Sequence, residues 1–431
     1  MPRCGLRLVT RQSHKFERMI DEERDRVNTT EQPNTVTITD YEVARQALRH
    51  KDLRQALYDA GDVVMADVLV NLHGDEHRAR RRLENRLFRK DTHTHYERDL
   101  FPAVVESTLA PYAQEGSAEL VRVSHQMMMN LAALTAGVDR PLQTPDESFR
   151  LYEYLMLFIE GATLAHFMGD QDAKRAEVAD ALRNFDTEFL QPSVARRRAL
   201  LDDLNSGRIE ESALPRDVLT VILRNQENLD MPSDVVLRET CFYLLAGAHT
   251  SATAFVRTLD NVFRYCADDL ASVDGVDLAF LQRCAHETIR LQPSSPVAMR
   301  WAMNDLELAD GVRIAKGDKV VIDLHTANRQ LSTFGADAEV FDPNRELASG
   351  VARWGLSFGL GMHACIGQDL AAGVDPRGVS DPADQLYGLV PVAVQRLLQL
   401  GGRPDPEAPP MLDPTSARGY WLSYPVRFAR S

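Results

Sequence analysis

The sequence has no long apolar run. None of its hydrophobic stretches reaches the ~18 uncharged residues that a membrane-spanning helix needs. The first residues, MPRCGLRLVTRQSHKFERMIDEER, contain no apolar segment of the kind found in a signal peptide or an anchor. We therefore expect a soluble protein that does not bind membranes.

Positive charge and cysteine are both scarce. The chain has 49 Lys and Arg against 63 Asp and Glu, a formal net charge of −14. This balance argues against general nucleic-acid binding and makes any local basic cluster more informative. The cysteines form no C-x-x-C pair, which argues against a disulfide scaffold or a zinc ribbon and predicts a cytoplasmic location. They are Cys4, Cys241, Cys266, Cys284 and Cys365.

The pattern of apolar residues predicts a mainly α protein with a small β portion. No internal repeat or linker marks a domain boundary among the 431 residues, so we expect a single domain. The predicted elements are a strand, turn and short helix over 34–53, helices from about 75 to 270, a hairpin and strand near 300–325, a Gly/Pro/Asp-rich loop over 373–388, and then a helix and a final strand, WLSYPVRF.

The longest predicted helix runs from Ser233 to about Arg264, with apolar residues at helical spacing throughout. Its middle reads AGAHTSAT, a poor composition for the centre of a long buried helix. One interpretation is tight helix packing on Ala246 and Gly247. The other is a loosened turn that a ligand approaches, with hydroxyls bonding locally.

One cysteine has an unusual setting, the stretch FGLGMHACIGQDLA at 358–371. Glycines surround Cys365, and a helical pattern follows it, so backbone N–H groups and the helix N-terminus favour its thiolate. A lone thiolate is a poor start for a tetrahedral zinc site, but it suits the single protein ligand of a haem iron. On these residues alone, a buried core cysteine remains the alternative, as for Cys241, Cys266 and Cys284 in their helical patterns.

The same stretch resembles the haem loop of the cytochrome P-450 (haem-thiolate monooxygenase) family. The family pattern F-x-x-G-x-H/R-x-C-x-G is matched by Phe358, Gly361, His363, Cys365 and Gly367. The resemblance covers residues 35–430 and implies the cytochrome P-450 fold, with a long central helix over the haem. It also implies haem b as cofactor, Cys365 as iron ligand, and one domain over 1–431. Its β-containing lobe would comprise 35–55 and 295–345, and its helical lobe 75–290 and 358–400.

Two further motifs follow the family's order. HETIRLQP carries the E-x-x-R pair as Glu287 and Arg290, one helical turn apart, and FDPNR supplies the third partner, Arg345. An E-x-x-R pair alone is common on exposed helices. In the family, this carboxylate is shared between two guanidiniums in a structural network that braces the haem loop.

The AGAHT segment matches the family's central helix. The resemblance places Thr250 at the threonine that controls oxygen chemistry, and Ala246 and Gly247 at the small residues over the iron. His249 departs from the usual acid. Histidine accepts and donates protons near neutral pH, so we expect His249 to replace the acid in a proton relay. The alternative is that His249 fills space or hydrogen-bonds a polar group on the substrate.

The family neutralises the haem propionates with a few cations and donors. The matching residues are His77 and Arg81 in HGDEHRARRR, Arg300 in PVAMRWA, and His363. We predict a helix over 78–90 whose cations recruit an acidic ferredoxin or flavodoxin, reduced by an NAD(P)H-dependent reductase. A merely solubilising helix is the alternative. These cations are Arg78, Arg80, Arg82, Arg86, Arg89 and Lys90. No residues remain for a fused reductase domain, so we expect electrons from separate proteins.

The resemblance implies insertion of one oxygen atom from O2 into a C–H bond of an apolar small molecule, by hydroxylation or O-dealkylation. A peroxide-driven peroxygenase is one alternative, although AGAHT lacks the Arg–Pro pair of such relatives; a non-catalytic haem-binding protein is another. The sequence does not identify the substrate, and the 373–388 segment departs from the family pattern. Candidate pocket residues, each also compatible with core packing, are Met65, Met156, Phe158, Phe167, Leu245 and Val297.

Overall fold

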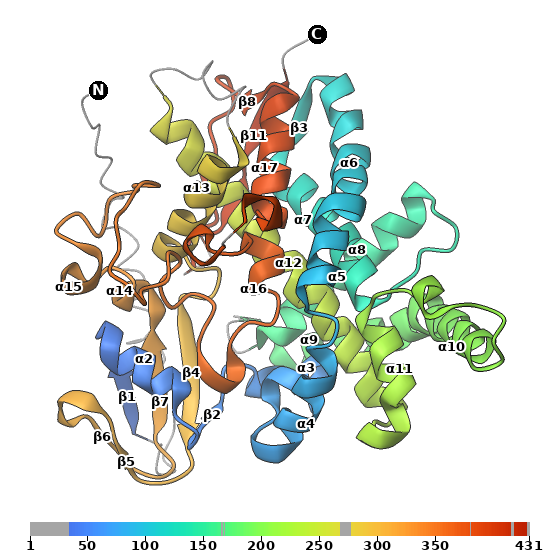
Figure 1. Cartoon of the computed structure of the whole chain (residues 1–431), viewed down its shortest axis with the longest axis horizontal. Coiled ribbons are helices and arrows are strands. Elements are labelled where there is room, and N and C mark those ends of the chain that lie inside the picture. Colours follow the sequence, from blue (N-terminus) through green and yellow to red (C-terminus); the bar gives the residue numbers. More distant parts are fainter. Residues whose placement is uncertain are drawn as a thin grey trace. The chain divides into compact units, whose positions relative to one another are not determined.

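The computed structural model describes residues 34–164, 167, 169–267, 277–379, 381–414 and 418–428 (Figure 1). Cys4 and the charged lead-in lie outside the described residues. The chain divides into two compact units. The first combines Met1–Arg54, Tyr96–Ser124 and Thr250–Ser431, and the second combines Gln55–His95 and His125–His249. The prediction of one domain over 1–431 stays a prediction.

A four-stranded mixed sheet with the order β1-β7-β4-β2 belongs to the first unit, apart from the last residue of β2. β1 runs parallel to β7 in the register Thr35↔Lys319 to Ile38↔Ile322. β4 runs antiparallel to β7, from Val297↔Asp323 to Trp301↔Lys319. The strands are β1 (Thr35–Ile38), β2 (Leu53–Gln55), β4 (Val297–Ala302) and β7 (Lys319–Asp323).

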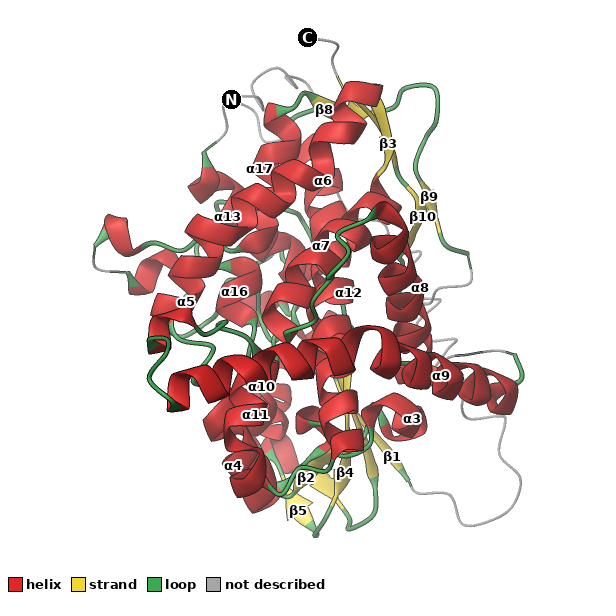
Figure 2. Ribbon diagram, turned by 90° about the vertical axis from the view of Figure 1, so that its right-hand side faces the viewer, coloured by secondary structure: helices red, strands yellow, loops and turns green. Residues whose placement is uncertain are grey.

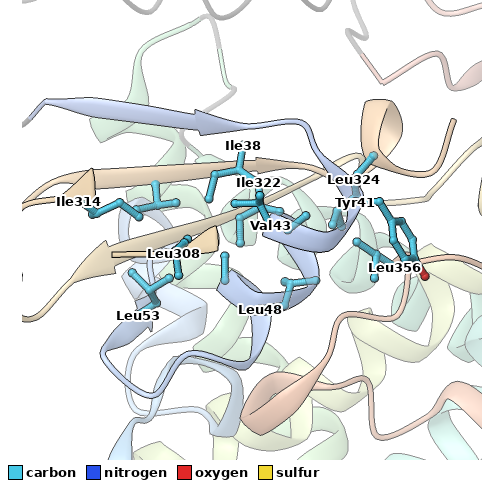
Figure 3. Close-up of a cluster of buried hydrophobic side chains, with 14 of the residues drawn as sticks. Ile38, Tyr41, Val43, Leu48, Leu53, Leu308, Ile314, Ile322, Leu324 and Leu356 are labelled. Atoms are coloured by element: carbon cyan, nitrogen blue, oxygen red, sulfur yellow. The ribbon is translucent and has the colours of Figure 1, made fainter. Parts of the chain in front are cut away.

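Helix α2 (Tyr41–Arg49) packs against this sheet (Figure 3). The Asp40 carboxylate caps its first turn by accepting from the N–H groups of Glu42 and Val43. Its buried side chains, including Tyr41 and Leu48, join a hydrophobic cluster with strand residues such as Ile322. Leu356, which precedes the predicted haem loop, belongs to the same cluster. The β portion therefore supplies a rigid base for that loop.

The rest of the first unit is mainly helical, with small sheets. β11 pairs antiparallel with both β3 and β8, while β5–β6 and β9–β10 form two-stranded ribbons. The helices are α6 (Phe101–Glu115), α13 (Leu278–Leu291), α14 (Leu324–Ala327), α15 (Leu331–Phe334), α16 (Gln368–Ala372) and α17 (Leu389–Gln399). The strands are β3 (Ser117–Glu119), β5 (Leu306–Glu307), β6 (Arg313–Ile314), β8 (Gly402–Pro404), β9 (Met411–Leu412), β10 (Trp421–Ser423) and β11 (Pro425–Phe428).

The described part of the second unit consists almost entirely of helices (Figure 2). Side chains at the helix starts satisfy free N–H groups: Thr144 caps α8, Asp170 caps α9 and Asp217 caps α11. The helices are α3 (Asp62–Met65), α4 (Gly74–Glu84), α5 (Lys90–His95), α8 (Pro145–Ala162), α9 (Gln171–Phe185), α10 (Gln191–Asn205) and α11 (Val218–Leu229). Helices α7 (Leu120–Ala136) and α12 (Ser233–Tyr265) contribute residues to both units.

The long predicted helix is confirmed as α12, which starts at Ser233 and ends one residue beyond Arg264. It is continuous through AGAHT, so the expected loosened turn is wrong. Gly247 instead allows close helix packing, because a Cβ there would lie 3.2 Å from the Cβ of Ala132 on α7. The packing interpretation therefore accounts for Gly247.

Most other predicted elements are confirmed. The hairpin near 300–325 is β5–β6 followed by β7, with Gly311 and Gly317 at positive φ. The final predicted strand is divided at Tyr424 into β10 and β11, which belong to different sheets. The predicted helix over 78–90 ends at Glu84, and α5 begins at Lys90. Within the described residues, no helix is long and apolar enough to span a membrane.

Candidate active site

Cys365 lies between the short 3-10 helix Gly361–His363 and α16, and it is exposed. The Cys365 N–H donates to Phe358 O at 2.8 Å, and the Gly359 N–H donates to Leu356 O at 2.8 Å. Cys241 and Cys284 are buried, and this burial raises the pKa of both thiols well above the ordinary value. Among the described cysteines, Cys365 is therefore the most exposed residue, as a single thiolate ligand of a haem requires.

Gly361 explains one glycine of the haem-loop pattern. Its φ is +69°, and a Cβ there would lie 2.9 Å from Arg49 Cα and from Leu48 O. A side chain at this position would clash with the end of α2, so glycine lets the turn lie against that helix. The packing of α2 thereby fixes the backbone that carries Cys365. A cysteine in a fixed position suits the role of iron ligand to a haem.

The three residues predicted as a network do form one. Arg290 donates to both carboxylate oxygens of Glu287, at 2.7 and 2.6 Å, and Arg345 Nε donates to Glu287 Oε1 at 3.1 Å. Arg290 is 0% exposed, Glu287 4% and Arg345 5%. Other guanidinium N–H groups donate to backbone carbonyls, including Asn328 O and Phe334 O, and Arg345 also donates to the Asp337 carboxylate at 2.7 Å. These buried charges are therefore paired and hydrogen-bonded.

Asn328 and Ser357 connect this network to the cysteine loop, and the sequence interpretation missed both. Asn328 donates to Arg290 O at 3.1 Å and to Ser357 Oγ at 2.9 Å, and it accepts from Leu356 N at 2.7 Å. Ser357 Oγ in turn donates to Ile289 O on α13 at 2.7 Å. Helix α13 therefore holds the backbone just before the loop through side-chain hydrogen bonds.

Aromatic packing adds a second connection. Trp354 makes edge-to-face contacts with His286 on α13 and with Phe358 in the loop. His286 Nε2 lies 2.8 Å from Ala372 O, and burial lowers the pKa of His286 to about 4. The neutral ring therefore donates to the carbonyl at the end of α16. Phe358 is thus packed against Trp354, which in turn packs on α13.

The 373–388 segment is a loop whose two ends meet. Val374 N donates to Leu386 O at 2.9 Å, and a Cβ on Gly388 would lie 2.3 Å from Gly373 N. Gln282 on α13 holds the two ends together by donating to the carbonyls of Ala372, Val374 and Leu386. We call Ala372–Val374 together with Leu386–Gly388 the neck. The segment therefore leaves and rejoins the fold at one place, between α16 and α17.

In the second unit, α4 carries the residues predicted to contact the propionates. His77 is buried and Arg81 is partly buried. Burial, and then the nearby Arg81, lower the pKa of His77 to about 4. His77 is therefore neutral at pH 7 and suited to donate a hydrogen bond, while Arg81 carries a positive charge.

Arg80 was predicted to help recruit an electron donor, and this prediction is wrong. Arg80 is buried and ion-paired with Glu239 at 3.0 Å, and it also donates to Asp67 O. Its position on α4, three residues after His77, turns it toward the interior of the unit. The other predicted cations are exposed: Arg78, Arg82, Arg86, Arg89 and Lys90.

A buried acidic cluster lies beside Arg80. Glu239 accepts from Leu69 N as well as from Arg80, and burial raises its pKa to about 7. Glu84 accepts from the Tyr243 hydroxyl at 2.5 Å. Burial, and then the charge of Glu239, raise the pKa of Glu84 well above its ordinary value. Burial in this cluster therefore favours the protonated form of Glu84.

His249 has a partner that the sequence interpretation missed. His249 Nδ1 lies 3.3 Å from His125 Nε2, and both residues belong to the second unit. The next residue, Thr250, is exposed, and its backbone carbonyl accepts from Ser294 Oγ at 3.0 Å within the first unit. The two residues predicted to handle protons therefore both lie on α12, each with a defined neighbour.

The remaining predicted residues are placed as follows. Arg300 is buried on β4, and His363 and Ala246 are partly buried. Phe158 packs edge-to-face on Phe185, which is the core-packing alternative for that residue. Of the other candidate pocket residues, Met65, Leu245 and Val297 are buried, and Met156 and Phe167 are partly buried. Ala165, His166 and Met168, within the predicted substrate-side segment, lie outside the described residues.

Comparison with known proteins decides the family. The family model described as Cytochrome P-450 matches residues 267–372, which include Glu287, Arg290 and Cys365. Pulcherriminic acid synthase of Bacillus subtilis is 27% identical over 367 residues, or 81% of this chain and 82% of that protein. The chain is a cytochrome P-450. This cytochrome P-450 is a haem-thiolate monooxygenase of the bacterial type, and its cofactor is haem b.

Solved structures agree on the cytochrome P-450 fold. P450BioI, crystallised with an acyl carrier protein bearing hexadec-9Z-enoic acid, has a TM-score of 0.71 at 17% identity and covers 97% of this chain and 98% of its own. CYP109B1 from Bacillus subtilis has a TM-score of 0.69 at 16% identity, covering 96% and 99%. The predicted fold class is thereby confirmed. The family model's match ends at residue 372, where the 373–388 loop begins.

Proposed function

We propose that this cytochrome P-450 hydroxylates or O-dealkylates an apolar small molecule, with Cys365 as the iron ligand. The observation that carries the proposal is the exposed Cys365 thiol in a hydrogen-bonded turn held from behind by α13. Haem b, when bound, would activate O2 with electrons from a separate donor, and a thiolate ligand favours cleavage of the O–O bond.

The protein's own groups would hold the cofactor and move protons. His77, Arg81, Arg300 and His363 would contact the propionates, a role supported by the donor chemistry of neutral His77 and charged Arg81. Thr250, an exposed residue, would hydrogen-bond water at the reaction site, and His249 would deliver protons. Apolar side chains such as Leu245 and Val297 would orient the substrate and exclude bulk water.

A separate acidic protein would supply the electrons. Arg78, Arg82, Arg86, Arg89 and Lys90 are exposed cations on a chain of net charge −14, a contrast that favours an acidic ferredoxin or flavodoxin served by an NAD(P)H reductase. The scattered cysteines without a C-x-x-C pair favour a reducing, cytoplasmic location.

The decisive experiment compares Cys365→Ser with Cys266→Ser, a matched change at a partly exposed cysteine near the end of α12. Reduced wild-type protein with carbon monoxide should give the absorption band of thiolate-ligated haem. Cys365→Ser should lose this band because a serine hydroxyl is a poor iron ligand, and Cys266→Ser should keep it. A surviving band in Cys365→Ser would refute the assignment. Screening apolar compounds for a shift of the resting spectrum would then identify substrates.

A further inference from the structure

The contact between His125 on α7 and His249 on α12 joins two ionisable rings. The ring planes are 27° apart, with centroids separated by 5.6 Å and Nε2 of His125 3.3 Å from Nδ1 of His249. The close packing of Gly247 on Ala132 brings the two helices together near this pair. His125 is only 9% exposed, so its ring is held by the interior of the unit rather than moving in solvent.

This geometry restricts where protons can reside. For a hydrogen bond between Nε2 and Nδ1, one nitrogen must carry a proton and the other must present a lone pair. When both rings are neutral, the shared proton fixes both tautomers. If both rings were protonated, two N–H groups would face each other and two positive charges would lie together. The pair therefore accommodates one extra proton, and not two, while the bond is intact.

We propose that His125 passes protons to His249, so that the two histidines act as one proton carrier. This inference rests on the proposed role of His249. When Nδ1 of His125 takes up a proton from its neighbours, the Nε2 proton of that ring moves to Nδ1 of His249. The Nε2 proton of His249 leaves to water at the reaction site. One proton enters and one leaves, and exchange with water restores the starting tautomers between turnovers.

Two substitutions of His125 separate relay from positioning. His125→Gln places an amide near the former Nε2, where it can still hydrogen-bond His249 Nδ1 but cannot carry an extra proton. His125→Phe keeps a ring of similar size without any hydrogen bond. The measured quantity is the product formed per NAD(P)H consumed, with the amount of haem-loaded enzyme taken from the carbon monoxide spectrum. The solvent deuterium effect on oxygen consumption is measured alongside it. His50→Gln, at the end of α2, is the matched control.

A relay predicts that both variants lose coupling severalfold, with a matching rise in hydrogen peroxide and a changed solvent deuterium effect. His50→Gln should behave like wild type. Nitrogen NMR of histidine-labelled protein, recorded on the diamagnetic carbon monoxide complex, gives a readout independent of turnover. The signal of the shared Nδ1 of His249 should change in His125→Phe and stay close to wild type in His125→Gln.

The other outcomes overturn either the relay or the proposed role of His249. Wild-type coupling in His125→Gln with poor coupling in His125→Phe would mean that His125 only positions His249, and would overturn the relay. Wild-type coupling in both His125 variants would also overturn the relay. If the His249→Ala variant is itself poorly coupled, either of these two results overturns the relay but leaves the proposed role of His249 standing. Normal coupling in His249→Ala would overturn that role and the relay together.

Discussion

The Glu287 carboxylate joins two buried guanidiniums. Its replacement by alanine would leave Arg290 and Arg345 buried without that partner, which costs on the order of 3–5 kcal/mol. We expect Glu287→Ala to yield little haem-loaded protein, measured as haem per purified chain and by thermal unfolding.

The matched control is Glu307→Ala. Glu307 pairs with Arg313 across an exposed ribbon, where both side chains are more than half accessible, so its loss should change neither measurement. Normal haem content in Glu287→Ala would contradict the bracing role of the network.

Glu84 predicts a specific pH dependence. In the unfolded chain it ionises near pH 4.3, whereas its raised pKa keeps the folded group protonated to higher pH. The folded state then binds more protons, so the free energy of unfolding falls as pH rises above about 4.3. Glu84→Gln is isosteric and cannot ionise, so it removes this loss.

The thermal unfolding temperature of Glu84→Gln relative to wild type should therefore increase as the pH rises above about 4.3. Glu307→Gln, a change at an exposed carboxylate, should show a constant difference. A constant difference between Glu84→Gln and wild type over this range would mean that Glu84 is already ionised in the folded protein.

Residue by residue, sequence patterns succeed where a motif fixes both spacing and order. Glu287, Arg290 and Arg345 could be predicted to meet because three motifs follow one another in the expected sequence. His125 carries no such signal, since its partner lies 124 residues away. Arg80 was hidden in a basic run, although the spacing of His77, Arg80 and Glu84 places all three on one helix face.

At the scale of elements, α12 was predictable because its apolar repeat persists over its whole length. The end of α4 at Glu84 was not, because no Gly or Pro marks it. At this end of α4, Glu84 makes a buried contact with Tyr243, which is a tertiary contact that no local sequence pattern reveals. Local patterns therefore locate helices more reliably than they locate ends set by distant residues.

The glycines of the neck give an element-scale prediction. Gly388 has a φ of +88°, and an added Cβ would lie 2.3 Å from Gly373 N, so alanine there must distort backbone. We expect Gly388→Ala to lower the thermal unfolding temperature and haem retention. A Cβ added at Gly378, within the same loop, would meet nothing within 4 Å, so Gly378→Ala should be neutral. Equal stability of the two variants would show that the neck is not rigid.

At the scale of the whole molecule, charge distribution predicts how electrons arrive. Arg82→Glu with Arg86→Glu reverses two exposed cations and should slow reduction by an acidic ferredoxin, measured by stopped flow. Added salt should slow the wild-type reaction, since screening weakens steering. Reduction by dithionite should not change, and Arg313→Glu, on the β6 strand, should behave like wild type. Rates that do not respond to salt would indicate a different docking surface.

In a continuous helix, the number of residues between two positions sets the distance between them. The neck removes this constraint between Cys365 and α17. Because the chain departs after Ala372 and returns by Gly388, the number of residues between them does not set the distance from Cys365 to α17. The exposed stretch around Gly378 is thus a natural splice point. A foreign peptide inserted there, such as an affinity sequence or a tethered electron-transfer module, should lengthen the excursion while leaving the thiolate turn where it is.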